Sequence, residues 1–363
     1  MASAAPTRVR QRGRLVWLAL LVMVLAAAAA AGAYTWLTNS FAAPGPAAAV
    51  ARVQVAPGMS LRAVLNRLQS EGLLRNARAV AWYLRLQGRN VKVESGLYEI
   101  PAHASPAQIL ELFAEGKVVL EQLTVVEGAT FADFLAILAA QPHLVHTVRG
   151  RTPAQVMSLL GHTGEDPEGE FFPDTYRFAA GTSDVAILTQ SYEAMQRELA
   201  AAWQARSPGL PFEKPYQALI LASLVEKEAA LKSERSAIAG VFVNRLRKGM
   251  RLQSDPTVIY GLGDNYDGSI HTRDLQTDTP YNTYTREGLP PTPIALPGRE
   301  SLLAAVQPED TGALYFVATG AGDGAHHFSK SLEEHNQAVQ AYLARLRSTA
   351  RAQAAATPGA GHP

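Results

Sequence analysis

An uncharged run from Leu15 to Leu37 constrains this chain more than any other feature of its sequence. At about 1.5 Å of rise per residue, a helix over this run is long enough to cross a hydrocarbon core of roughly 30 Å. Trp17 lies near one end of the run, and Tyr34 and Trp36 lie near the other, as interfacial aromatic side chains do. We therefore predict a single transmembrane helix over residues 15–37.

The residues before this run indicate its orientation. Residues 1–14 contain four arginines and form a predicted cytoplasmic tail: Arg8, Arg10, Arg12 and Arg14. By the positive-inside rule, we expect everything after residue 38 to lie outside the cytoplasm. A cleaved signal peptide is the main alternative, because Ala26 to Ala31 resembles a small-residue cleavage site. The run is longer than a usual signal h-region, which favours a retained anchor.

The composition excludes several kinds of chemistry. The 363 residues include no cysteine, which removes disulfides, thiolate metal sites and a cysteine nucleophile. The net charge of +1 gives no field that would attract nucleic acid. We expect no metal, no cofactor and no nucleic-acid partner.

Hydrophobic periodicity predicts an α+β chain with two folded parts after a linker over residues 38–50. Residues 51–120 alternate short strands and helices and form a small α/β module, with a strand at Gly96–Ile100 and a helix at Ala77–Leu86. Residues 121–347 are mixed and mainly helical, with a long irregular stretch over 250–300 that is typical of functional loops. The segment 169–176 is expected to be a packed loop or pocket wall. Residues 348–363 are predicted to be a disordered tail.

One predicted helix in the second part carries charges that need a reason. Residues 218–225 are apolar apart from Ser223, yet the helix ends in Glu226, Lys227 and Glu228. Glu228 shares a stripe with Leu221, Leu224 and Val225, whereas Glu226 lies on another stripe. Apolar neighbours and a helix C-terminus both raise a carboxyl pKa, which suits a general acid. An ordinary surface pair of Glu228 with Lys232 is the alternative.

Two loops suggest a cleft for a polar ligand. Residues 250–260 and 281–291 place amide, hydroxyl and carboxylate groups beside aromatic rings. Sugars are bound by such a mixture, because their hydroxyls need hydrogen bonds and their C–H faces need flat apolar surfaces.

Several long motifs, in order, resemble those of the YceG/MltG-like endolytic murein transglycosylases. The resemblance runs from about residue 53 to about residue 345. It rests on these segments: Gly96-Leu-Tyr98 with Ser105 and Gly116-Lys117, Phe172-Pro-Asp-Thr-Tyr176, Leu221-Ala-Ser-Leu-Val-Glu-Lys-Glu228, Val241-Phe-Val-Asn-Arg-Leu246, Met250-Arg-Leu-Gln-Ser-Asp-Pro-Thr-Val-Ile-Tyr-Gly261, Tyr281-Asn-Thr-Tyr-Thr285 and Gly288-Leu-Pro-Pro291. Thr292 stands where the family often has glycine, and the C-terminal tail is longer.

The resemblance implies a single-span protein with a LysM-like module at 51–120 and a catalytic domain at 121–347. It implies that Glu228, the second glutamate of Glu-Lys-Glu, is the essential acid. The family reaction is non-hydrolytic cleavage of peptidoglycan between N-acetylmuramic acid and N-acetylglucosamine, which leaves a 1,6-anhydro sugar. This is a carbon–oxygen lyase reaction. Cell-wall synthases such as penicillin-binding proteins are expected partners, because nascent strands must be cut near their source.

On this reading one carboxylate is enough, since the 6-hydroxyl of the substrate replaces the second carboxylate of ordinary glycosidases. The candidates for holding the sugar are Gln253, Asp255, Tyr260, Asn282 and Tyr284. Ser223 is a candidate for orienting Glu228, with small core packing as the alternative. Glu226 is the second choice for the acid, although a surface or structural carboxylate is its more probable role.

Three other functional classes are alternatives to this function. A non-enzymatic glycan-binding scaffold for wall synthases is the main alternative, and residues 51–120 suit it. A metalloprotease is disfavoured because the chain has no His-Glu-x-x-His, and His326, His327 and His335 are a weak metal signal. A serine hydrolase is disfavoured because no Gly-x-Ser-x-Gly occurs.

Overall fold

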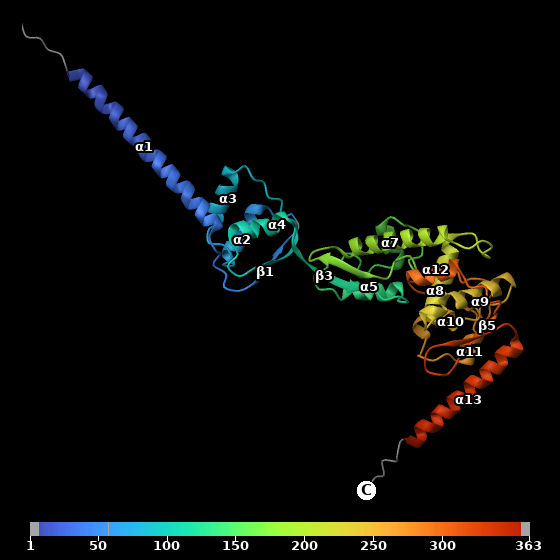
Figure 1. The fold of residues 1–363 in the computed structure, drawn as a ribbon. Coiled ribbons are helices and arrows are strands. Elements are labelled where there is room, and N and C mark those ends of the chain that lie inside the picture. Colours follow the sequence, from blue (N-terminus) through green and yellow to red (C-terminus); the bar gives the residue numbers. More distant parts are fainter. Residues whose placement is uncertain (1–6, 57, 357–363) are drawn as a thin grey trace, which may run out of the picture. The chain divides into compact units, whose positions relative to one another are not determined.

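The protein mixes helices and strands in two compact units, as a computed structural model shows. The structure describes residues 7–56 and 58–356. The first unit runs to Glu121 and takes in Arg177–Thr182, and the second holds Gln122–Tyr176 and the chain from Ser183. Figure 1 shows the order of the elements within each unit. The predicted mixed α and β character, with one N-terminal apolar helix, is confirmed.

The N-terminal helix α1 (Thr7–Ala42) contains the predicted span. Its apolar part, Leu15–Ala42, contains an 18-residue window with a mean hydropathy of 2.5, and the protein buries none of the side chains in that window. This part is long and apolar enough to cross a membrane, and the span itself stays a prediction. The helix continues through Ala42, so the predicted linker at 38–50 begins as helix. The side chains of Arg8, Arg10, Arg12 and Arg14 lie outside the described residues.

The first unit contains an antiparallel sheet packed against helices. Its strands are β1 (Ala51–Val55), β2 (Gly96–Ile100) and β3 (Val118–Thr124). Val53 pairs with Tyr98, which pairs in turn with Val118. Helices α2 (Leu61–Ser70), α3 (Ala77–Leu86) and α4 (Pro106–Ala114) complete the unit. The predicted bounds of β2 and α3 are confirmed, and the LysM-like assignment stays a prediction.

Capping residues start the helices of this unit. The Ser60 hydroxyl accepts a hydrogen bond from the amide of Ala63 at the start of α2. Ser105 and Gln108 form a reciprocal capping box at the start of α4, where Pro106 needs no amide partner. Buried Tyr98 meets Phe113 edge to face, with ring centroids 4.7 Å apart, and they join the sheet to α4 in one core.

The second unit is mainly helical and holds the largest core. In chain order its elements are α5 (Phe131–Ala139), α6 (Pro153–Leu160), α7 (Asp184–Gln204), α8 (Pro215–Glu228), α9 (Arg235–Arg247), α10 (Asp255–Leu262), α11 (Thr272–Gln276), α12 (Arg299–Val306), β5 (Tyr315–Ala318), β6 (His326–Ser329) and α13 (Leu332–Ala356), with short 3-10 turns at Lys232–Glu234 and Gly263–Asn265. Strand β4 (Thr175–Ala179) begins in this unit, and its residues from Arg177 belong to the first unit. Strands β1 to β4 follow one another in sheet order, and β5 pairs with β6.

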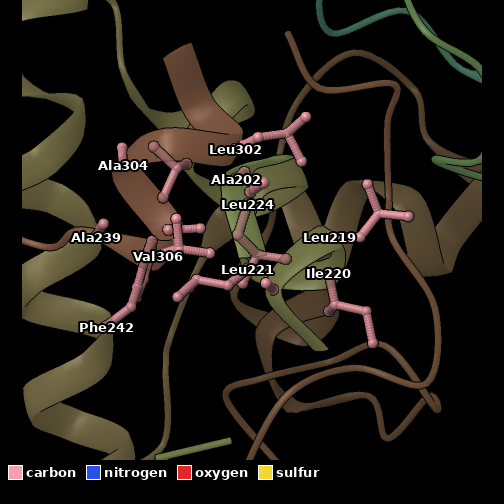
Figure 2. Packing of buried hydrophobic residues seen from close by; sticks show 14 of the residues in the cluster. Ala202, Leu219, Ile220, Leu221, Leu224, Ala239, Phe242, Leu302, Ala304 and Val306 are labelled. Atoms are coloured by element: carbon pink, nitrogen blue, oxygen red, sulfur yellow. The ribbon is translucent and has the colours of Figure 1, made fainter. Parts of the chain in front are cut away.

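Helix α8 is the centre of this core, as its apolar sequence predicts. Every residue from Ala218 to Val225 is buried. Leu221 and Leu224 lie among Phe242 of α9 and Val306 of α12 (Figure 2). A helix enclosed on all sides has a fixed axis, so the residue at its end is held in one place.

Two predictions about the second unit need correction. The stretch 250–300 is less irregular than predicted, because it contains α10 and α11. Both helices are short, and Pro256 in the first turn of α10 is a helix-starting residue that periodicity alone does not register. The predicted disordered tail begins too early, because α13 continues to Ala356 through an alanine-rich segment that favours helix. Residues 357–363 lie outside the described chain.

Candidate active site

Glu228 is the last residue of α8, at the edge of the buried core. Leu221, Leu224 and Val225, which share its stripe, are each 0% exposed. The helix stops because Ala229 adopts an extended backbone with φ −82° and ψ 102°. The core therefore fixes the base of the Glu228 side chain, while the carboxyl group lies at a point where the chain leaves the core.

The surroundings of Glu228 raise its pKa to about 7. Burial of the carboxyl group is the main cause, and the negative charge of Asp255 acts in the same direction. A hydrogen bond from Ser254 and the nearby His326 ring act in the opposite direction. The residue as a whole keeps some solvent exposure, as an acid that meets a substrate requires. At neutral pH the carboxyl group exists in both protonation states, so it has the property of a proton donor that later becomes an acceptor.

Ser254 is the direct partner of Glu228, and sequence reasoning missed it. Its hydroxyl donates to Oε1 of Glu228 over 2.6 Å. Ser254 is the N-cap residue of α10, yet its side chain makes no capping hydrogen bond, because the hydroxyl is used by Glu228. Its amide donates to Oγ1 of Thr283, which also hydrogen bonds to Thr257 over 2.8 Å. This buried network holds Ser254 in position, and the helix-cap pattern Ser-Asp-Pro was the signal that sequence reasoning did not use.

Asp255 and Tyr284 lie beside Glu228. Tyr284 Oη donates to Oδ1 of Asp255 over 2.5 Å. Burial is the main cause of the raised pKa of Tyr284, and the charges of Asp255 and Glu228 act in the same direction. Asp255 is exposed and Tyr284 is half-buried. Of the five predicted sugar-binding residues, these two interact electrostatically with the candidate acid.

Gln253 completes this side of the site in an unusual backbone conformation. Its φ is +51°, in the left-handed region that few non-glycine residues adopt. Its amide donates to the Thr283 carbonyl over 3.1 Å, and its side-chain Oε1 accepts from Arg245 over 3.2 Å. Buried Arg245 also donates to the carbonyls of Arg251 and Leu252, so it holds the loop that leads into Ser254. Gln253 is exposed and remains a candidate for substrate contact.

Tyr260 and Asn282 are placed differently from the prediction. Tyr260 Oη donates to the buried Glu168 over 3.1 Å, away from the partners of Glu228. Asn282 is 0% exposed, and its amide nitrogen donates to the carbonyls of Asp274, Leu275 and Thr277. Asn282 therefore shapes the loop and presents no group to a sugar, which corrects its prediction as a binding residue. The loop motif made it conspicuous, but a sequence does not show which polar groups the backbone itself consumes.

Ser223 also has a structural role. Its hydroxyl donates to the Ile220 carbonyl over 2.7 Å and accepts from the amide of Ile294 over 3.0 Å. Both partners are backbone groups, so Ser223 does not contact Glu228, and the packing alternative describes it better. These two hydrogen bonds link the loop before α12 to the middle of α8.

Glu226 is engaged in an ion pair on the other side of α8. Its Oε1 accepts from Arg235 over 2.6 Å, and its Oε2 accepts from the amide of Gly298 over 2.9 Å. The side chains of Glu226 and Arg235 are only 4% and 7% exposed. Arg235 also pairs with Glu127 and Glu300. Both oxygens of Glu226 are occupied by positive or N–H partners, which is the arrangement of a structural carboxylate.

The histidines are also accounted for by ordinary contacts. His326 Nδ1 lies 2.7 Å from Oε2 of Glu234, and the ring of His335 stacks on Tyr315. Across the described residues, no three or more His, Asp or Glu side chains gather in a way that would hold a metal ion.

Comparison with known proteins places the chain in a family. The profile of the YceG-like family matches residues 53–341, which is most of the chain. The chain belongs to this family. The resemblance noted from its motifs is thereby confirmed, over nearly the same range of residues.

The relatives compared with this YceG-like chain are named for the same activity. The chain is 30% identical to an endolytic murein transglycosylase of Bacillus subtilis, over 80% of this chain and 84% of the relative. It is 26% identical to an endolytic murein transglycosylase of Streptococcus pneumoniae, again over 80% of this chain but only 58% of the relative. It is also similar to a YceG-like protein of Listeria monocytogenes of known crystal structure, with 32% identity over 79% of this chain and 98% of the other, and a TM-score of 0.49.

Two further buried carboxyl groups of this YceG-like chain were missed by sequence reasoning. Burial raises the pKa of Glu168 and that of Glu170 to about 7. Glu168 accepts from the amide of Phe131 over 3.0 Å, and Glu170 accepts from Gln196 over 2.7 Å. Glu168 directly precedes the aromatic segment 169–176 that was predicted to be a packed loop or pocket wall, and Glu170 lies inside it. Acids beside so many apolar residues were an available signal.

Proposed function

We propose that this chain is a membrane-anchored murein transglycosylase that cleaves the glycan strands of peptidoglycan, with Glu228 as its acid and base. The single observation that carries the proposal is the Glu228 carboxyl group, which is fixed at the end of a buried helix and whose pKa is raised to about 7. The family membership and the names of the relatives support the same substrate and reaction class. The residues around Glu228 supply hydroxyl, carboxylate and aromatic groups of the kind that sugars bind.

The mechanism needs two proton transfers at Glu228, one from its carboxyl group and one back to it. In the first step, protonated Glu228 donates to the oxygen that joins N-acetylmuramic acid to N-acetylglucosamine, and the bond between this oxygen and C1 breaks. In the second step, the 6-hydroxyl oxygen of the muramic residue bonds to C1, and its proton passes to the Glu228 carboxylate. Water is not consumed, a 1,6-anhydro end is formed, and the acid is regenerated. A group with a pKa near 7 serves both steps at neutral pH.

The partners of Glu228 suit both halves of this cycle. Ser254 donates to the carboxylate and stabilises it after the first step, whereas burial and Asp255 favour the protonated form before it. The residues around Glu228 that we propose to bind the sugars are Asp255, Tyr284 and Gln253. We place the catalytic units on the periplasmic side of the inner membrane, held by α1, where wall synthases such as penicillin-binding proteins release nascent strands.

The test is Glu228→Gln in the soluble chain that begins at residue 39. The variant keeps its shape but has no proton to donate, so we expect it to fold and to lose at least about a thousandfold of cleavage. The products from purified peptidoglycan are identified by mass spectrometry. Glu193→Gln, at an exposed position of α7, is the matched control and should cleave normally.

Two outcomes would contradict parts of the proposal. Anhydromuramic products from Glu228→Gln would remove Glu228 as the acid. Reducing ends in place of anhydro ends from the native chain would show hydrolysis and would remove the second step. Glycan binding without any cleavage by the native chain would support the scaffold alternative.

A further inference from the structure

Helices α2 and α3 of the first unit carry a dense basic surface. Residues 61–92 contain six arginines and one lysine but a single acid, Glu71, and that acid is paired with Arg67. Among the residues whose side chains are described, Arg62, Arg75 and Arg78 form no ion pair and are exposed. Isolated cations at this density need a counter-charge from outside the protein.

A groove runs between these two helices. It has a volume of about 580 Å³, and its floor is made of apolar residues such as Leu65 and Ala81. Its rim carries Arg62, Arg78 and Arg85 beside Trp82. The Trp82 side chain is 60% exposed, and the guanidinium of Arg85 lies 6.0 Å from the centre of its ring. Exposed tryptophan with arginine around a small apolar groove is the combination found at membrane surfaces.

The end of α1 fixes the height of this surface relative to the apolar span. The ring of Phe41 in α1 stacks on Tyr83 of α3, with centroids 4.1 Å apart. Trp36 and Leu37 of α1 line a second cavity together with Asn76 and Ala79 of α3. Trp36 is the last aromatic residue of the apolar run and is 56% exposed. Helix α3 is therefore level with the residue that marks the membrane interface.

The segment that follows α1 is held by hydrogen bonds, so the position of α3 along the axis of α1 is fixed. The amide of Gly45 donates to the carbonyl of His103, whose own amide donates to the carbonyl of Ala47. A Cβ atom at Gly45 would lie 2.4 Å from the backbone oxygen of Ala104, which only glycine avoids. The segment is held against the module on which α2 and α3 lie.

We propose that the surface formed by Arg62, Arg75, Arg78, Trp82 and Arg85 binds the anionic phospholipid headgroups of the bilayer that α1 spans. The guanidinium groups donate to lipid phosphates, and Trp82 inserts at the level of the headgroups. This inference rests on the proposed anchor role of α1. The lining carries three guanidinium groups and no carboxylate, with the side-chain amide of Asn66 as its neutral polar group, and this excess of positive charge favours phosphate over a neutral glycan. The contact fixes the orientation of the first unit on the outer face of the membrane.

The absence of native cysteine permits a direct test on the full chain. A single cysteine is introduced by Leu86→Cys, next to the surface at the end of α3, and carries a fluorophore. The chain is reconstituted into phosphatidylcholine or phosphatidylglycerol vesicles that contain a headgroup-attached quencher. We expect strong quenching in phosphatidylglycerol, weak quenching in phosphatidylcholine, and loss of the difference at high salt.

Paired variants separate the surface from charge in general. Arg78→Gln with Arg85→Gln should lower the ratio of docked to undocked chains in phosphatidylglycerol by roughly thirtyfold, since each surface arginine contributes about fivefold. Arg52→Gln with Arg177→Gln removes two exposed arginines of the same unit from strands β1 and β4 and should leave the quenching unchanged. Equal quenching in both lipids, or equal effects of both pairs, overturns the proposal.

A second label distinguishes failure of the anchor from failure of the surface. Ala28→Cys lies in the middle of the apolar part of α1 and reports an acyl-chain quencher. Quenching at residue 28 without quenching at residue 86 leaves the anchor intact and overturns the headgroup contact. No quenching at residue 28 overturns the anchor, and the headgroup proposal falls with it. A response at residue 86 to soluble glycan strands in place of phosphatidylglycerol assigns the surface to a glycan and also overturns it.

Discussion

At the scale of single residues, the two glutamates at the end of α8 differ in their partners more than in their sequence surroundings. Glu228 receives a hydroxyl hydrogen bond, whereas Glu226 receives a guanidinium and an amide. The stripe of Leu221, Leu224 and Val225 predicts burial near Glu228, and burial is indeed the main cause of its raised pKa. The partners are residues 254, 235 and 298, and no local sequence pattern predicts contacts between residues so far apart in the chain.

Ser254→Ala tests the tuning of Glu228. Loss of a hydrogen bond that lowers the Glu228 pKa lets this pKa rise above about 7. The acid is active while protonated, so a raised pKa keeps it protonated to higher pH. We expect the fall in kcat/KM on the alkaline side to move up by about one pH unit. The measurement is cleavage rate against pH.

Ser223→Ala is the matched control for this change. Its hydroxyl bonds only to backbone groups of Ile220 and Ile294, so its loss should lower stability without moving the pH profile. A profile that shifts equally in both variants would show that general loosening of the core, and not the hydrogen bond to Glu228, sets the pKa.

At the scale of elements, the sequence predicted the units that have full hydrophobic periods or clear caps. Helix α3, strand β2 and the all-round apolar α8 were found because their patterns extend over enough residues. Helices α10 and α11 were missed, since eight and five residues give too few turns for a period to be visible. Strand β4 was missed for the same reason. Part of the site lies on α10, so hydrophobic periodicity could not predict the structure of that part.

Glu226→Gln tests the junction of α8 with α9. The change removes the negative charge of the buried partner closest to Arg235, and the remaining charged partners, Glu127 and Glu300, are more exposed. We expect a loss of about 3 kcal/mol in the free energy of unfolding, measured with denaturant, while cleavage per folded molecule persists. Glu300→Gln, at the exposed end of the network, should cost less than about 1 kcal/mol. Unchanged stability with abolished cleavage would instead make Glu226 the acid.

At the scale of the whole molecule, α1 belongs to the first unit as well as containing the predicted membrane span. Its last turn places Phe41, only 9% exposed, in the core that also contains Tyr98 and Phe113. The sequence suggested a linker from residue 38, because alanine, proline and glycine are common there. Composition does not show that a short helical end packs on a neighbour over forty residues away. The folded unit therefore takes in Phe41, which the sequence had suggested to be part of a linker.

Two truncations test this boundary. Chains that begin at residue 39 or at residue 51 both lack the apolar span, and we expect both to leave the membrane fraction. Only the longer chain keeps Phe41, so the shorter one should lose about 2–3 kcal/mol of stability in its first unit. Hydrogen exchange at α3 measures this difference. Phe41→Ala in the longer chain should reproduce the loss, and equal protection in all three forms would contradict the packing role.

The diverted cap at Ser254 has a consequence for which residues this position tolerates. Serine, aspartate and asparagine are nearly interchangeable as the first residue of an ordinary helix. Here the side chain must donate a proton to Glu228, and an aspartate would set a second negative charge against it. At position 254, a replacement that favours helix capping is therefore one that impairs the chemistry of Glu228. In a library of variants selected only for stability, it is where aspartate would be recovered and cleavage would disappear.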